Sequence, residues 1–129
     1  MKHDFFIAGR WRNKEEVLAV TKLVRDAGFS AYCFLENDYS ETFDALGLSP
    51  DAMEAENTEK LALDHPLIEA IFEKDMAGQR ASERFLLVLP AGIAGHIEAG
   101  AAYGMQKRCY AVGPVEKTET LYRIFDQIF

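Results

Sequence analysis

The chain has 129 residues, a mass of 14.5 kDa, 49% hydrophobic residues and 27% charged residues, which predicts one globular domain over residues 1–129. Its formal net charge of −7 argues against nonspecific binding to nucleic acid, because such binding needs a basic face that neutralises phosphates. No apolar run approaches the ~20 residues of a membrane span and the N-terminus lacks a signal-peptide core, so we expect a cytoplasmic protein without a membrane partner.

The N-terminal half alternates strand-like and helix-like patterns. Residues 4–8 form a predicted strand, residues 14–27 a helix that Gly28 closes, and residues 30–35 a second strand. The helix carries an apolar stripe of Val17, Val20, Leu23 and Val24. Residues 36–63 are acidic and irregular, with a short helix predicted to start at Ser49 and Pro50. This segment is longer than a usual connection, which favours a functional loop or lid.

The C-terminal half continues the alternation. A helix is predicted over residues 65–81, a strand over 84–89, a helix over 96–106, a strand over 108–112 and a terminal helix over 118–129. Strands that are separated by helices and apolar throughout indicate a parallel sheet covered on both faces. The predicted fold class is therefore α/β, a single-domain doubly wound parallel sheet of the flavodoxin or Rossmann-like kind, with strand order 2-1-3-4.

Cysteine and histidine usage predicts no metal site. Cys33 and Cys109 each lie in an apolar strand-like run without a Cys-x-x-Cys motif, so we expect two buried thiols. His3, His65 and His96 are too scattered along the chain to predict a set of metal ligands.

Two glycine-containing loops follow strands one and three, where the ligand crevice of such a sheet opens. In the first loop, Gly9 and the guanidinium groups of Arg10 and Arg12 suit a phosphate or a sugar hydroxyl, although solvated arginines are the plain alternative. Trp11 either walls a bound ligand or covers the core as a lid. Residues 36–40 emerge at the same edge, where they could select a ligand by hydrogen bonds and stacking.

The second loop leads to a single carboxylate. After the buried strand, Gly92 and Gly95 fit a tight turn, and Gly95 allows close approach of a ligand to the next helix's N-terminus. Glu98 then falls in the predicted first helical turn, where the helix dipole and unpaired amides favour the ionised form that a nucleophile needs. From spacing alone, a glutamate that only caps the helix is the more frequent explanation.

A second carboxylate lies on the predicted helix 65–81. That helix has an apolar stripe of Leu67, Ile68, Ile71, Phe72 and Met76. Asp75 follows Ile71 by four residues and shares its face, so an acid is placed among core-facing positions. Periodicity alone also allows Asp75 to lie at the edge of the stripe in solvent, or to pair with Lys74 or Arg80.

These motifs resemble a known family. The stretch from Leu89-Pro90-Ala91-Gly92 through Glu98-Ala99-Gly100-Ala101-Ala102-Tyr103 resembles the signature of the nucleoside 2-deoxyribosyltransferases, in which a glutamate followed by x-Gly-x-Ala is the covalent nucleophile. Residues 5–13 are similar to that family's first strand and its Ala-Gly-x-x-Arg loop. The resemblance covers essentially the whole chain in the right order, and it extends to the deoxynucleoside 5′-monophosphate N-glycosidases that share the fold.

The resemblance implies roles for several residues. Glu98 matches the nucleophile, Asp75 matches an aspartate that contacts the sugar or relays a proton to the leaving base, and Arg12 occupies the Gly-x-x-Arg position. It also implies a small-molecule nucleoside or nucleotide as ligand, chemistry without a metal or redox cofactor, and a homodimer or larger homo-oligomer.

Three positions depart from the family pattern. Phe6 stands where several relatives have a tyrosine whose hydroxyl assists catalysis, Gly92 replaces a serine that contacts phosphate in the monophosphate hydrolases, and His96 occupies a position that is often small. These changes weaken the case for a 5′-phosphate preference, although His96 and backbone amides could compensate.

The sequence therefore predicts an enzyme that cleaves the N-glycosidic bond of a (deoxy)nucleoside or its 5′-monophosphate, with hydrolysis favoured over transfer. Base exchange, as by a nucleoside 2-deoxyribosyltransferase, is one alternative. A phosphoribohydrolase of the lysine-decarboxylase-like group is another, although residues 90–98 match its Pro-Gly-Gly-x-Gly-Thr-x-x-Glu motif only in part. A noncatalytic sensor of a nucleotide derivative is the third.

Overall fold

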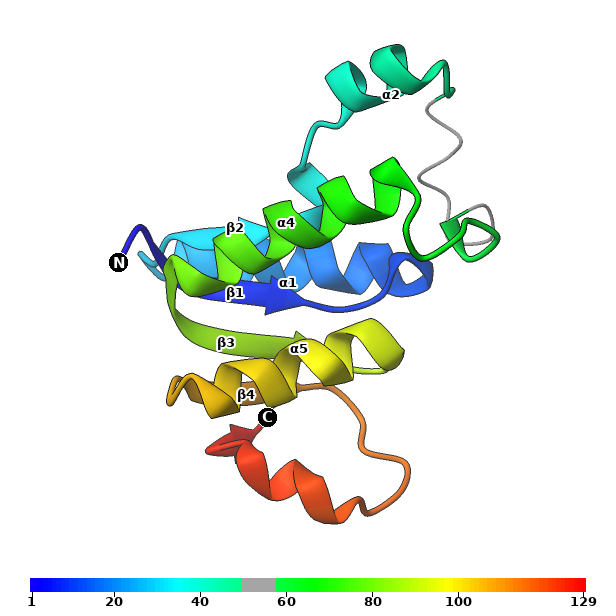
Figure 1. The fold of residues 1–129 in the computed structure, drawn as a ribbon. Helices are drawn as coiled ribbons and strands as arrows, with labels where there is room; N and C mark the ends of the chain where they lie inside the picture. The colour runs from blue at the N-terminus through cyan, green and yellow to red at the C-terminus, as the bar shows by residue number, and fades with distance from the viewer. Residues whose placement is uncertain (50–57) are drawn as a thin grey trace.

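The computed structural model describes residues 1–49 and 58–129. In this part of the chain, five parallel strands form one sheet in the order β2-β1-β3-β4-β5 (Figure 1). The strands are β1 (His3–Ala8), β2 (Ala31–Cys33), β3 (Ser82–Val88), β4 (Arg108–Val112) and β5 (Gln127–Ile128). The predicted doubly wound parallel α/β fold is confirmed, and its predicted order 2-1-3-4 is extended by one strand.

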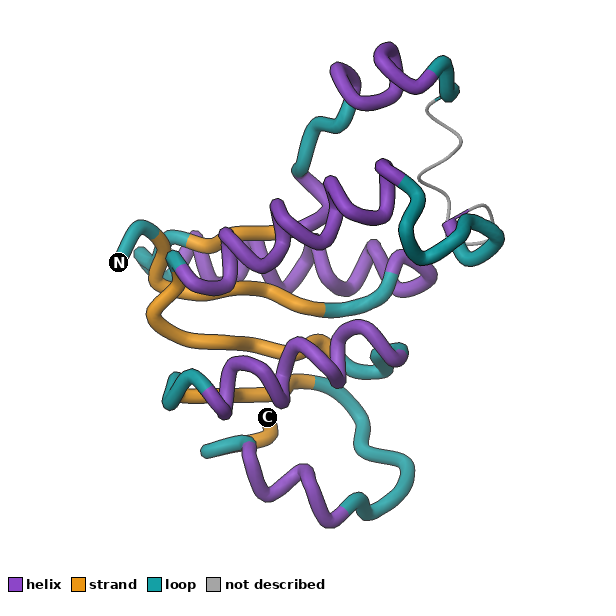
Figure 2. Tube along the Cα trace, in the orientation of Figure 1, coloured by secondary structure: helices purple, strands orange, loops and turns teal. Residues whose placement is uncertain are grey.

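Helices cover both faces of the sheet. The helices are α1 (Lys14–Asp26), α2 (Ser40–Leu46), α4 (Pro66–Arg80) and α5 (Ile93–Gly104), with 3-10 turns η1 (Trp11–Asn13), η2 (Phe34–Glu36) and η4 (Thr120–Ile124). Figure 2 shows α4 and α5 on one face of the sheet and α1 on the other. The site discussed below lies on the face that α4 and α5 cover.

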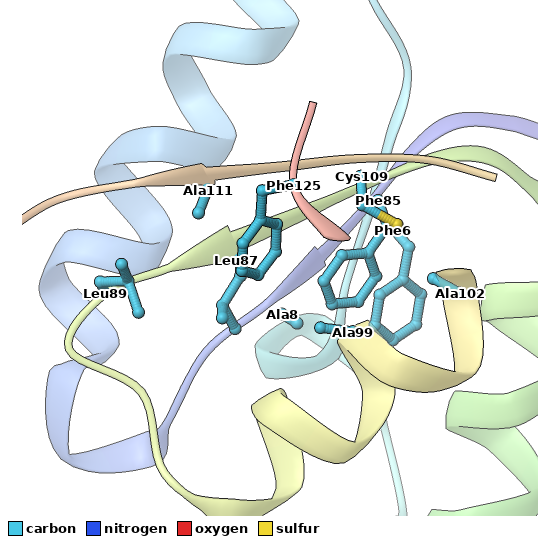
Figure 3. Packing of buried hydrophobic residues seen from close by; sticks show 10 residues of the cluster. All are labelled: Phe6, Ala8, Phe85, Leu87, Leu89, Ala99, Ala102, Cys109, Ala111 and Phe125. Atoms are coloured by element: carbon cyan, nitrogen blue, oxygen red, sulfur yellow. The ribbon is translucent and has the colours of Figure 1, made fainter. Parts of the chain in front are cut away.

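Alternation along the central strands divides the core into two clusters. Phe6 and Phe85 point toward α5, where they join Leu87, Ala99 and further residues of the cluster drawn in Figure 3. Ile7 points the opposite way and packs with Val17 of α1 and its neighbours. Cys109 belongs to the first cluster and Cys33 to the second, and both are buried free thiols, as predicted.

The helix boundaries follow local chemistry. Helix α1 ends before Gly28, whose φ of +95° is costly for other residues. Helix α4 begins after His65, whose Nδ1 accepts a hydrogen bond from the Leu67 amide at 3.0 Å, and Pro66 takes the first helical position. Two predicted stripe residues face outward instead, because Leu23 is 68% exposed and Phe72 is 57% exposed.

The predicted terminal helix over residues 118–129 is wrong. After η4, the chain runs alongside β4, where the Asp126 amide bonds the Cys109 carbonyl at 2.7 Å and the Phe129 amide bonds the Ala111 carbonyl at 2.8 Å. Phe125 is buried in the cluster beneath α5. The edge of β4 thus gains hydrogen-bond partners that a helix in this place would not supply.

Two further predictions need correction. The second strand is shorter than residues 30–35, because η2 begins at Phe34. Within the irregular segment, residues 40–46 form helix α2, which ends at Gly47 with a φ of +67°. Of the short helix predicted from Ser49 and Pro50, all but Ser49 lies outside the described residues. None of the helices in the described ranges has the length and apolar character needed to cross a membrane.

Candidate functional site

Glu98 lies one helical turn deeper than predicted. Gly92 is the N-cap of α5, and the His96 amide already bonds the Gly92 carbonyl at 3.3 Å, so the helix begins at Ile93 rather than at His96. Glu98 is therefore in the second turn, beyond the unpaired amides that would favour its ionised form. The prediction of a first-turn glutamate is wrong for this reason.

The surroundings of Glu98 favour its neutral form. Burial, and then the negative charge of Asp75, raise the pKa of Glu98 from an ordinary value of 4.5 to about 8. At neutral pH the carboxyl group of the free protein is thus mostly protonated. The expectation of an ionised Glu98 at neutral pH is wrong, because that carboxyl is partly buried and faces a second acid.

Asp75 occupies the inner face of α4, as its position after Ile71 predicted. The Tyr32 hydroxyl lies 3.0 Å from Asp75 Oδ1 and the Asn37 amide nitrogen 3.2 Å from the same oxygen, and both donate to it. Burial raises the pKa of Asp75, while these two hydrogen bonds and then the charge of Lys74 oppose that rise. Asp75 is therefore built into a polar network rather than into an ion pair at the edge of the helix.

The network contains Tyr32, which the sequence analysis assigned to no site, and two residues of the stretch 36–40. Tyr32 was expected only as part of the second strand, and it reaches Asp75 because β2 pairs with β1. Asn37 and Tyr39 lie in the 36–40 stretch that was expected to select the base, and the Asn37 amide lies 3.2 Å from the Tyr39 hydroxyl. The signal that pointed to the stretch 36–40 as part of a site was its position directly after a parallel strand.

Gln79 links the two helices that carry the acids. Its side chain is fully buried, and its Nε2 donates to the Glu98 backbone carbonyl at 2.7 Å, which joins α4 to α5. Its Oε1 has no hydrogen-bond partner among the described residues. The Gln79 bond fixes the backbone of Glu98 relative to α4, the helix of Asp75.

The two glycine-containing loops meet, as predicted. A Cβ on Gly95 would lie 2.9 Å from Leu87 Cδ1 and 3.8 Å from the Gly9 carbonyl oxygen, and a Cβ on Gly9 would lie 2.5 Å from Val17 Cγ2. Gly9 and Gly95 thus permit close packing of the chain on itself. Gly92, by contrast, has open space around its Cα.

The other first-loop residues have partners within the protein. Arg12 pairs with Glu59 at 3.1 Å, with both side chains about half exposed (49% and 61%). The Arg10 carbonyl accepts from the Asn13 amide at 3.0 Å, and Trp11 meets the ring of Phe34 edge-on at 6.1 Å. The predicted roles of Arg10, Trp11 and Arg12 in binding a ligand stay predictions.

His96 connects α5 to the C-terminal segment. Its Nδ1 lies 2.7 Å from the Gly92 carbonyl oxygen and its Nε2 lies 2.9 Å from the Tyr122 hydroxyl, and the two rings stack at 5.7 Å. Both ring nitrogens are thus engaged. A role for His96 in binding substrate stays a prediction, and a ligand would have to replace one of these contacts.

A polar hollow of about 350 Å³ adjoins the network. It is lined by residues 38–42 together with Ala70 and Lys74. Tyr39 belongs both to this lining and to the Asn37 network, and the Lys74 ammonium lies 5.1 Å from the centre of the Tyr39 ring. The hollow offers hydrogen-bonding groups and an aromatic ring close to Asp75.

Replacing Glu98 by glutamine tests the burial of its carboxyl group through protein stability. Because the folded-state pKa of about 8 lies above the ordinary 4.5, the folded protein binds the Glu98 proton more tightly than the unfolded chain does. The wild type therefore loses stability through this group as the pH rises from about 5 to about 8. The glutamine variant has no such loss.

We expect the Glu98→Gln variant to exceed the wild type in free energy of unfolding by an amount that grows across this range, to on the order of 2 kcal/mol. Urea unfolding at several pH values measures the difference. Glu73→Gln, at an exposed position of α4, is the matched control. A difference that stays constant with pH would contradict the assigned environment of Glu98.

Comparisons with known proteins support the fold. No protein-family model and no curated protein sequence matches the chain. A 2-deoxyribosyltransferase from the psychrotolerant bacterium Bacillus psychrosaccharolyticus matches in structure with a TM-score of 0.65 and 14% identity, over 98% of this chain and 85% of that chain. The TIR domain of the Toll-related receptor TRR-2 from Hydra magnipapillata matches with a TM-score of 0.57 and 14% identity, over 98% and 84%. At these identities, the chain shares with both proteins a fold, the doubly wound parallel α/β sheet.

Proposed function

We propose that this protein cleaves the N-glycosidic bond of a nucleoside or a nucleoside 5′-monophosphate, with Glu98 as the nucleophile. One observation carries the proposal: α4 and α5, joined by the Gln79 bond to the Glu98 carbonyl, each carry a partly buried carboxyl group, and burial and then the charge of Asp75 raise the pKa of Glu98. Paired acids of this kind perform nucleophilic and proton-transfer steps in glycoside chemistry. The fold shared with a 2-deoxyribosyltransferase is compatible with this chemistry.

The proposed reaction has two displacements at the anomeric carbon. In the first, an ionised Glu98 oxygen forms a bond to that carbon while the bond to the base nitrogen breaks, and its electron pair leaves with the base. The departing base takes up a proton from solvent, which Asp75, itself ionised in the free protein, relays. In the second, water attacks the same carbon and passes a proton to Asp75, the glycosyl–Glu98 bond breaks, and the Glu98 carboxylate is regenerated. An incoming base in place of water would give transfer.

The hollow beside Tyr39 is the proposed site for the base. It shares Tyr39 with the network around Asp75, and we place the base there so that its leaving nitrogen faces this network. Because Lys74 lies over the buried Tyr39 ring, the polar groups of residues 38–42 supply the hydrogen bonds to the base. Arg12 is the proposed contact for a 5′-phosphate, for which it must exchange its ion pair with Glu59.

Activity should depend on the ionisation of Glu98. Because the nucleophile must be ionised and its pKa is about 8 in the free protein, we expect kcat/KM for base release to rise with pH through about 8. Glu98→Gln should abolish base release while the protein stays folded. Asp75→Asn removes the like charge, so its residual activity should rise at lower pH than that of the wild type. A folded Glu98→Gln variant with wild-type turnover would refute the nucleophile.

Arg12 should distinguish phosphorylated from unphosphorylated substrates. A charge-assisted hydrogen bond to a bound anion contributes roughly 1.5–3 kcal/mol, so we expect Arg12→Ala to weaken monophosphate binding about tenfold or more. Nucleoside binding should change much less, and Arg10→Ala, the matched control in the same loop, should have a smaller effect on both. Equal losses of affinity for both ligands in Arg12→Ala would mean that this guanidinium does not bind the phosphate.

Product analysis separates hydrolysis from transfer. We expect hydrolysis, because the basic first loop suits a nucleotide that keeps its phosphate, and water then resolves the intermediate. The experiment incubates a deoxynucleoside monophosphate with and without an excess of a different free base. Free deoxyribose phosphate should dominate in both samples. An exchanged nucleotide as the main product would establish transfer and leave the Glu98 mechanism in place.

A further inference from the structure

A directed chain of hydrogen bonds ends on Asp75. The Asn37 amide donates to the Tyr32 hydroxyl oxygen at 2.7 Å, and the Tyr32 hydroxyl donates to Asp75 Oδ1 at 3.0 Å. That hydroxyl also lies 3.2 Å from the Lys74 carbonyl oxygen, but it has one proton, and the shorter contact directs this proton to Asp75. Asn37 itself donates a further bond to the same carboxylate oxygen.

Packing fixes the direction of the Tyr32 hydroxyl. The Tyr32 ring stacks on Phe6 of β1 with ring centres 5.1 Å apart and an angle of 12° between the planes. The ring also lies against Gly78 of α4, where a Cβ would come within 2.6 Å of it. A ring confined in this way can hold its hydroxyl in place without a large loss of side-chain entropy on binding Asp75.

We propose that Tyr32 is a positioning residue, which orients the Asp75 carboxylate and keeps the proton of the Asp75–Glu98 pair on Glu98 in the free protein. The role of Tyr32 in catalysis rests on the proposed function, whereas its effect on the protonation of Asp75 and Glu98 does not. Donors aimed at a carboxylate stabilise the charged form. Burial raises the pKa of Tyr32 above its ordinary value, so its hydroxyl stays a donor across the physiological range.

The other groups around Asp75 do not replace Tyr32 in this role. Glu98 faces Asp75 from α5 with a like charge when ionised. Lys74 contributes only its charge, since its Nζ bonds the Asp38 carbonyl oxygen at 3.2 Å and lies over the Tyr39 ring. The Tyr39 hydroxyl lies 3.2 Å from the Asn37 amide nitrogen, whose two protons are directed at Tyr32 and Asp75. Tyr32 and Asn37 are the donors assigned to Asp75 in the described part of the chain.

Carbon-13 NMR of side-chain carboxyl groups tests the proposal without any substrate. Asp75→Asn and Glu98→Gln assign the two resonances, and a titration then gives both midpoints in the wild type and in Tyr32→Phe. Loss of the hydroxyl should raise the Asp75 midpoint and lower the Glu98 midpoint, each on the order of one pH unit. Tyr110→Phe removes a hydroxyl from the opposite face of the sheet, in the cluster around α1, and should move neither midpoint.

A second variant keeps the test decisive. Asn37→Ala removes one bond to Asp75 and the donor to Tyr32, so it should shift both midpoints in the same directions even if Tyr32→Phe does not fold. Midpoints that stay at their wild-type values in the folded variants would overturn the proposal. If the wild type releases no base from any nucleoside, the proposed function fails, yet the midpoints still decide the role of Tyr32. In an active enzyme, the pH dependence of kcat/KM should move to lower pH in Tyr32→Phe.

Discussion

A row of three stacked aromatic rings determines how the candidate site is built. Phe6 of β1 lies between Tyr32 and Phe85 of the neighbouring strands, with ring centres 5.1 Å and 5.9 Å apart and 12° between the planes in both pairs. Parallel pairing places the three residues at one level of the sheet. Phe6 and Phe85 are fully buried, whereas Tyr32 is partly exposed and extends its hydroxyl toward α4. One row thus supplies both the floor beneath the helices and a polar group for Asp75.

The helices above this row hold the two acids at a cost in stability. Burial of a carboxyl group disfavours its charged form, and a second carboxylate nearby adds repulsion, so the free protein retains a proton on Glu98. The two acids have different surroundings. Tyr32 and Asn37 donate hydrogen bonds to Asp75, whereas burial and then the charge of Asp75 raise the pKa of Glu98. Environments that separate the pKa values of two neighbouring acids are a common feature of sites that use one as acid and the other as base or nucleophile.

Patterns that depend on local sequence predicted the fold and both acids. The strand around Phe6 and the helix beginning at Pro66 have strong periodicity and clear boundaries, so their positions were predictable. Asp75 was found because a charged residue on an apolar stripe is unusual. The terminal strand was not predictable, since residues 118–129 also fit a helix and the free edge of β4 decides between them. The role of Tyr32 was not predictable for a related reason. Its contact with Asp75 depends on strand pairing and on Gly78, and the residues next to Tyr32 in the sequence indicate neither.

The ionisation of Glu98 shows how a small shift in a helix start changes the chemistry. A helix that began at His96 would place Glu98 among free amides, and the carboxylate would be ionised at neutral pH. The actual start at Ile93 places Glu98 one turn further along the helix, beside α4. There burial, and then the charge of Asp75, raise the pKa of Glu98. In the proposed reaction, the groups that ionise Glu98 must then come from the substrate or from a change in Asp75. A sugar hydroxyl that donates to Glu98 would lower its pKa, as would neutralisation of Asp75, so binding of the substrate and activation of the nucleophile are coupled through the same pair of acids.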